Sequence, residues 1–194
     1  MLQWKCSSEK SLVSSPSQAQ SHVCYHLAST YTFPIGYVDM FMCMLRRCIS
    51  LKDLEKGHVI HGEITAHGFT EKSICVGTSL VHMYAKCGSF TEARNVLESL
   101  SVRNVVSWTS LIAGHVEHGY GEEALCCIKE MQREGISLNE ITFVCCLKAC
   151  GLIQDSNKGL GFHGETIKIG LPDVNAYIGS SLVDMYCKCG KLTS

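Results

Sequence analysis

The 194-residue chain carries almost no net charge, because 17 Lys and Arg residues face 18 Asp and Glu residues. Proteins that bind nucleic acid through a broad basic surface are strongly positive, so this class is excluded, and any RNA binding must depend on locally placed side chains. Long apolar runs are also missing. Lys, Arg, Glu or Gly interrupts each run before the about 18 residues that a membrane-spanning helix needs, so no membrane partner is expected.

Cysteine pairs with metal-binding spacing are absent as well. The chain has 13 cysteines, but no two of them stand as C-x-x-C. The odd number and the lack of a signal peptide argue against a disulfide framework. Five of the cysteines lie within apolar helical patterns: Cys126, Cys127, Cys145, Cys146 and Cys150. Because cysteine packs as a small hydrophobe, we interpret them as reduced, mostly buried thiols and expect neither a metal nor a cofactor.

What the chain does contain is an internal repeat. Shifted by 102 positions, Phe41 to Phe90 aligns without a gap on Phe143 to Leu192, with 20 of 50 residues identical. A shift of 31 positions then places Thr78-Ser79-Leu80 on Thr109-Ser110-Leu111. A long period is expected to divide in this way, because single helical repeats run roughly 20 to 50 residues. The predicted units are 38–73, 74–104, 105–139 and 140–175, with a partial unit at 176–194.

Each unit has the pattern of two helices around a glycine turn. In unit 105–139 the first apolar stripe is Trp108, Leu111, Ile112 and His115, and the second is Ala124, Leu125, Ile128 and Met131. Gly119-Tyr120-Gly121 separates the two stripes. In the preceding unit, Ser89 and Glu92 form a capping-box pattern at the second helix. No run alternates convincingly enough for a strand. The sequence predicts an all-α protein, an α-solenoid of stacked helix-turn-helix repeats.

The units resemble pentatricopeptide repeats. The likeness is carried by Asn104-Val105-Val106-Ser107-Trp108 with Glu123-Ala124-Leu125 and Met131, by Val76 to Gly88 with Ala93-Arg94, and by Gly57, His61 and Gly68 after Leu45 and Cys48. Their lengths resemble the motifs of the plant PLS subclass, in the order long, short, standard, long and partial short. The resemblance implies a right-handed superhelix.

The resemblance also implies a function. Members of this family bind single-stranded organellar RNA in a sequence-specific way, with side chains of each repeat presented to one base. A non-catalytic role is implied, in which the bound protein positions partner enzymes for RNA editing or processing. DNA is not an expected partner.

Two side chains per repeat select the base in this family, an early polar residue of the first helix and the last residue of the repeat. Carried onto this chain, they are Thr78 with Asn104 and Thr109 with Asn139. Thr with Asn resembles the adenine-favouring combination, since both groups can donate and accept hydrogen bonds, so two adjacent adenines are implied. Ser180 begins a further site whose partner lies beyond Ser194. The alternative is that these residues only cap helices and line solvated turns.

The two long units carry poor hydrogen-bonding pairs at the same positions. These are Met42 with Ser73 and Val144 with Asn175. We therefore expect the long units to space the array rather than to read a base.

Residues 1–37 differ from the rest. The first 36 contain eight serines, no arginine and Glu9 as the only acid. Organelle transit peptides are likewise rich in serine and poor in acids, although the missing arginines are less typical of mitochondrial ones. A degenerate repeat and a disordered lead are the alternatives. The expected location is the mitochondrion, with the chloroplast as the alternative.

Two patterns suggest catalysis. His61-Gly62-Glu63 and His163-Gly164-Glu165 match the H-x-E half of a zinc-deaminase signature, but the P-C-x-x-C half is absent. Recurrence at the same place in both long units predicts a packing role instead. His115 and His118 lack a third catalytic partner, and His115 continues an apolar stripe, so we predict a core histidine and no enzyme.

Two other interpretations stay open. A tetratricopeptide-type scaffold would hold a peptide or a helix, rather than RNA, in its groove. The second interpretation is a truncated, non-functional fragment, because the chain stops at 192–194, where the second helix of a repeat is expected.

Overall fold

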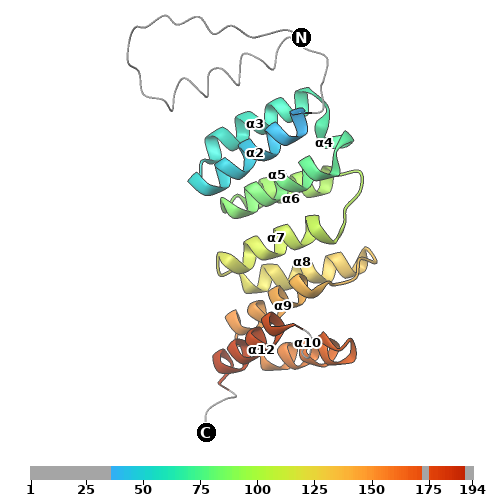
Figure 1. Ribbon diagram of the computed structural model, residues 1–194. Helices are drawn as coiled ribbons and strands as arrows, with labels where there is room; N and C mark the ends of the chain where they lie inside the picture. The colour runs from blue at the N-terminus through green and yellow to red at the C-terminus, as the bar shows by residue number, and fades with distance from the viewer. Residues whose placement is uncertain (1–35, 172–174, 191–194) are drawn as a thin grey trace, which may run out of the picture. The chain divides into compact units, whose positions relative to one another are not determined.

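The computed structural model describes residues 36–171 and 175–190, and all regular structure within these ranges is α-helical (Figure 1). The predicted lead, apart from Gly36 and Tyr37, lies outside them. The helices are α2 (Gly36–Leu51), α3 (Leu54–Ala66), α4 (Phe69–Lys72), α5 (Ile74–Lys86), α6 (Phe90–Ser99), α7 (Val105–Glu117), α8 (Gly121–Arg133), α9 (Glu140–Leu152), α10 (Ser156–Lys168) and α12 (Ala176–Lys188). None of these helices has the length and apolar character needed to cross a membrane.

Between Val38 and Ser194 the helices pack in a repeating nearest-neighbour pattern. The first helices of the last four units, α5, α7, α9 and α12, contact one another in chain order. The second helices α6, α8 and α10 each contact the first helix of their own unit and the first helix of the next one (Figure 1). A chain whose units contact only their neighbours is a solenoid, so the predicted all-α solenoid is confirmed.

Local sequence accounts for where the first helices begin and end. Ser73, Asn104, Asn139 and Asn175 are the N-caps of α5, α7, α9 and α12, and each side chain accepts a backbone N–H. After α7 the chain turns at Gly119, whose φ of 84° glycine adopts without strain. The two predicted apolar stripes of unit 105–139 are buried throughout, His115 included, which confirms the prediction of a core histidine.

The predicted capping box at α6 is wrong. Ser89 is the N-cap residue, but its hydroxyl donates to the Glu92 carboxylate (2.7 Å) and accepts no backbone N–H. A capping box forms at α7 instead. There Asn104 accepts from the Ser107 N–H, and the Ser107 hydroxyl accepts from the Asn104 N–H, both at 3.0 Å.

The 102-residue repeat reflects one helix junction that is built twice. Gly57 of α3 faces Met83 of α5, and a Cβ on this glycine would lie 2.7 Å from the Met83 sulfur. Gly159 of α10 faces Met185 of α12 in the same way, with a corresponding distance of 2.5 Å. In both places the missing side chain of the glycine leaves room for the end of the methionine side chain of the next first helix.

The two His-Gly-Glu segments lie at these same junctions. Nδ1 of His61 shares a hydrogen bond with the Tyr84 hydroxyl (2.9 Å), and Nδ1 of His163 shares one with the Tyr186 hydroxyl (2.7 Å). The histidine of each motif therefore makes the predicted packing contact. Within the described ranges, no group of three or more His, Cys, Asp or Glu side chains is placed to hold a metal ion.

Most of the cysteines that the sequence assigns to the core are buried there. Cys127, Cys145, Cys146 and Cys150 are buried, but Cys126 is exposed, so its assignment is wrong. Burial raises the pKa of Cys127 and Cys145 to about 11 and that of Cys150 to about 12. These thiols therefore stay protonated at neutral pH and behave as small apolar side chains.

Candidate nucleic-acid interface

The predicted base-selecting residues lie on or next to the first helices. Thr78, Thr109 and Ser180 are the fifth residues of α5, α7 and α12. Asn104 and Asn139 precede the first residues of α7 and α9, which pack next to α5 and α7. Each predicted pair therefore spans two neighbouring first helices.

Thr109 and Asn139 are joined by a third residue, Thr142. The Thr109 and Thr142 hydroxyl oxygens are 2.9 Å apart, and the Thr142 hydroxyl donates to Asn139 Oδ1 at 2.7 Å. Thr142 is fully buried and Thr109 nearly so. The structure thus brings this predicted pair together, and the sequence did not indicate the bridging threonine.

The other pair is arranged differently. Asn104 Oδ1 accepts the N–H groups of Val106 and Ser107, both at 3.0 Å, while the Ser107 hydroxyl donates to the Asn104 carbonyl (2.9 Å). Thr78 Oγ1 is buried and has no hydrogen-bond partner within the described ranges. No hydrogen bond links Thr78 to Asn104 in the described part of the chain, directly or through Ser107.

The corresponding positions of the long units are occupied by other contacts. Met42 accepts a hydrogen bond from the Ser79 hydroxyl at its sulfur (2.9 Å). The Asn175 amide donates to the Glu140 carboxylate at 2.6 Å, and Val144 offers no polar atom. These contacts are consistent with a spacing role for the long units, which stays a prediction.

Ser180 is exposed. Its hydroxyl donates to the Tyr177 carbonyl at 3.0 Å, a bond within α12 that any solvated serine can make. The structure therefore adds no contact that supports Ser180 as a base-selecting residue.

Exposed apolar side chains lie beside the predicted pairs, and the sequence analysis missed them. Val106, Ile141 and Tyr177, the second residues of α7, α9 and α12, are 56%, 64% and 78% exposed. Residues three apart share a helix face, so Val106 lies on the face of Thr109. The signal was present in the sequence, because Val106 is an apolar residue outside the buried stripe that begins at Trp108.

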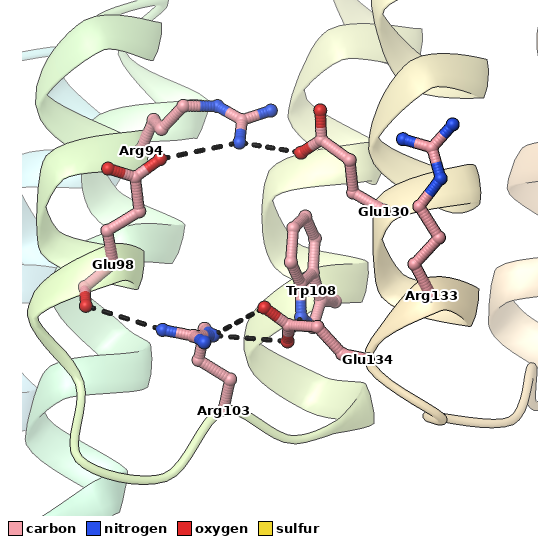
Figure 2. Close-up of a pocket in the computed structure, with 7 residues that line it drawn as sticks. All are labelled: Arg94, Glu98, Arg103, Trp108, Glu130, Arg133 and Glu134. Carbon is pink, nitrogen blue, oxygen red and sulfur yellow. Dashed lines mark hydrogen bonds and ion pairs between the residues drawn. The ribbon is translucent and has the colours of Figure 1, made fainter.

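A polar cavity of about 310 Å³ lies between α6, α7 and α8 (Figure 2). Arg94 pairs with Glu130 (2.7 Å), Arg103 pairs with Glu134 (2.8 Å), and the Trp108 indole donates to Glu134 (2.9 Å). Figure 2 shows each of these arginines directed at carboxylates. The lining holds three arginines and three glutamates, so it offers no net positive charge to a phosphate, and the Arg94–Glu130 pair ties α6 to α8.

A second cavity, of about 400 Å³, contains His58, His61 and Tyr84. The Tyr84 hydroxyl lies 2.9 Å from His61 Nδ1 and 3.1 Å from His58 Nδ1. Burial raises the pKa of Tyr84 to about 12 and lowers the pKa of His61, so both groups are neutral at pH 7. These contacts join α3 to α5.

The sequence matches known repeat proteins. Residues 78–105 match the PPR repeat, and residues 103–151 match the PPR repeat family. A chloroplastic pentatricopeptide repeat-containing protein of Arabidopsis thaliana is 40% identical over 76% of this chain and 24% of its own length. A mitochondrial one from the same plant is 34% identical over 80% of this chain and 22% of its own length. The chain thus spans about a quarter of the length of these curated relatives.

Solved structures show the same fold. The crystal structure of the pentatricopeptide repeat protein PPR10 from maize superposes with a TM-score of 0.62 and 21% identity, over 90% of this chain and 24% of that one. PPR10 in complex with an 18-nt psaJ RNA element superposes with a TM-score of 0.50 and 18% identity, over 89% of this chain and 30% of that one.

Proposed function

Because this chain carries pentatricopeptide repeats, we propose that it binds single-stranded RNA and selects bases through Thr78 with Asn104 and through Thr109 with Asn139. The observation that carries the proposal is the polar pair Thr109 and Asn139, which Thr142 joins on the helix face where Val106 is exposed. One of the structures that this fold resembles is a complex of PPR10 with RNA.

A base matches this surface in its chemistry. It has two apolar faces and an edge of hydrogen-bond donors and acceptors, all of which are accessible in a single strand. Exposed Val106 and Ile141 supply apolar contacts, and Thr109 and Asn139 supply polar ones. The near-zero net charge leaves little attraction for phosphates, so most of the binding energy has to come from the bases.

The proposed target carries two adjacent adenines, one for each Thr and Asn pair. The long units 38–73 and 140–175 flank these two sites and serve as spacers, because Met42 and Asn175 are engaged within the protein. Two base-selecting pairs make few contacts, so we expect weak affinity at physiological salt.

We place this binding in an organelle, the mitochondrion or the chloroplast, in support of RNA editing or processing by partner enzymes. Relatives named for each organelle support the first part of this proposal.

Fluorescence anisotropy tests the proposal with the full chain at low salt. RNAs of about ten nucleotides should bind more tightly with two central adenines than with a scrambled sequence, and Thr109→Ala and Asn139→Ala should remove that preference. Thr91→Ala, an exposed change on the second helix α6, is the control and should leave binding unchanged. If sequence and Thr109→Ala both make no difference, the chain is instead a protein-binding scaffold of the tetratricopeptide type.

A further inference from the structure

We propose that Thr142 determines base specificity at the Thr109 and Asn139 site by fixing which of their atoms donate and which accept. The inference rests on the proposed RNA binding. Thr142 would not touch the base itself, so it is a positioning residue.

The first step is the orientation of the Asn139 amide. As the N-cap of α9, Asn139 accepts the backbone N–H of Thr142 at 2.9 Å. Only the amide oxygen can accept this hydrogen bond, so Oδ1 faces the helix and the NH₂ group faces away. That NH₂ group makes no hydrogen bond within the described ranges, and Asn139 therefore presents donors.

The second step is the direction of the Thr142 hydroxyl. It lies 2.7 Å from Asn139 Oδ1, which carries no proton, so Thr142 is the donor. A hydroxyl has one proton to give, and Thr142 is fully buried, so no water competes for it.

The third step follows at Thr109. Its hydroxyl oxygen lies 2.9 Å from that of Thr142, whose proton is already used. Thr109 must therefore donate to Thr142 and keeps only acceptor capacity. The relay thus leaves a fixed acceptor at Thr109 and a fixed donor at Asn139.

This pattern selects a class of bases. Adenine and cytosine each carry an exocyclic amino donor next to a ring-nitrogen acceptor. The amino group matches Thr109, and the ring nitrogen matches the Asn139 amide. Guanine and uracil, in the same pose, would set a carbonyl against the Thr109 lone pairs and an N–H against the Asn139 amide. The relay therefore favours a base with an amino group at its pairing edge.

The chain contains its own comparison site. Ser107 occupies the position of Thr142 at the Thr78 and Asn104 site, but its hydroxyl is turned to the Asn104 backbone. Thr78 Oγ1 has no hydrogen-bond partner within 36–171 and 175–190, so no relay fixes whether its hydroxyl donates or accepts. The same two residue types should thus discriminate less strictly at Thr78 than at Thr109.

The test measures affinity of the full chain for RNAs in which one of the two central adenines is replaced by each other base. The adenine bound at the Thr109 site is identified by its response to Thr109→Ala. Replacing that adenine by guanine or uracil should weaken binding more than the same replacement of the adenine at the Thr78 site. Thr142→Val should reduce that discrimination about 2- to 10-fold, the range for one neutral hydrogen bond. Thr142→Ser keeps the hydroxyl and should preserve it. Thr91→Ala, the exposed change on α6, should also preserve it.

The possible results separate the two proposals. Absence of sequence-dependent RNA binding by the wild-type chain would overturn the proposed function. Wild-type discrimination that survives Thr142→Val unchanged would overturn only the role of Thr142. If Thr142→Val does not fold, ¹H NMR of the wild-type chain decides: the relay predicts slowly exchanging hydroxyl protons on Thr142 and Thr109, and rapid exchange of both would overturn it.

Discussion

Gly114 of α7 lies against Ala85 of α5 with no space for a side chain between them. A Cβ on Gly114 would lie 2.6 Å from the Ala85 Cβ and 3.1 Å from the Ala85 carbonyl oxygen. Ala85 is fully buried, and backbone atoms cannot rotate away as a flexible side chain can. This contact therefore sets the separation between the helices that carry Thr78 and Thr109.

Gly114→Ala should consequently destabilise the fold. Alanine favours a helix over glycine by about 1 kcal/mol, but the methyl group would force α5 and α7 apart at an overpacking cost of about 1–3 kcal/mol or more. We expect a net loss in the free energy of unfolding, measured by urea denaturation.

Gly62→Ala is the matched control. Gly62 lies in α3, is exposed, and has no atom within 4 Å of an added Cβ. The same substitution should therefore stabilise the chain by up to about 1 kcal/mol. If both variants shift stability in the same direction, close helix approach is not the reason for the glycine at 114.

Acidification should destabilise the fold from just below neutral pH. Burial lowers the pKa of His61, His82 and His115 below the ordinary value of 6.5. Below that value the unfolded chain takes up protons that the folded chain resists, so stability present above pH 6.5 is lost as the pH falls toward the lowered folded pKa values. Urea midpoints should thus decrease between about pH 7.5 and pH 5; a constant midpoint would contradict these shifts.

His115→Phe should reduce this pH dependence. The His115 ring stacks on Phe90, with 4.1 Å between centroids and 14° between planes, and its buried Nδ1 has no hydrogen-bond partner in the part of the chain that the structure describes. Phenylalanine can keep the stack while it removes the buried polar atom and the titration, so stability at pH 7 should rise by about 1 kcal/mol. An unchanged slope of stability against pH would exclude His115 as a contributor.

Glu134→Gln should weaken the link between α7 and α8. Burial opposes ionisation of Glu134, but hydrogen bonds from Arg103 and Trp108 outweigh it and lower the pKa of the carboxyl group. The ion pair is partly solvated, so we expect a loss of only about 0.5–1 kcal/mol in denaturant titration. Glu122→Gln is the control. It alters an exposed carboxylate 3.7 Å from the Lys158 ammonium group and should have no measurable effect on stability. Equal losses of stability in the two variants would refute the role of Glu134 as a link between helices.

The fold was predictable from the sequence because its signals are local. The Trp108 stripe specifies which helix face is buried, and Gly119 marks the turn that follows. The His-Gly-Glu repeat could be assigned to packing because the same segment recurs in equivalent units, and His61 and His163 do contact equivalent tyrosines.

The details that failed depend on how side chains turn in three dimensions. Ser89 and Glu92 have capping-box spacing, yet the hydroxyl turns to the carboxylate. Cys126 and Cys127 are adjacent in an apolar run, but only Cys127 faces the core. The Thr142 relay joins two helices through three side chains, and no spacing in the sequence reveals it.

Val106 should contribute to RNA affinity but not to base choice. It is 56% exposed, so Val106→Ser should change the free energy of unfolding by less than about 0.5 kcal/mol. Loss of an apolar contact with a base should weaken binding about fivefold, equivalent to roughly 1 kcal/mol. The ratio between adenine and guanine RNAs should stay constant, because Thr109 and Asn139 are untouched.

Val102→Ser is the control for this variant, since Val102 is 52% exposed but lies in the turn between α6 and α7 rather than on a first helix. It should bind RNA like the wild-type chain. Equal weakening by both variants would mean that general surface hydrophobicity, not the position of Val106 beside Thr109, supports binding. A changed base ratio in Val106→Ser would instead mean that the valine orients the base against the polar pair.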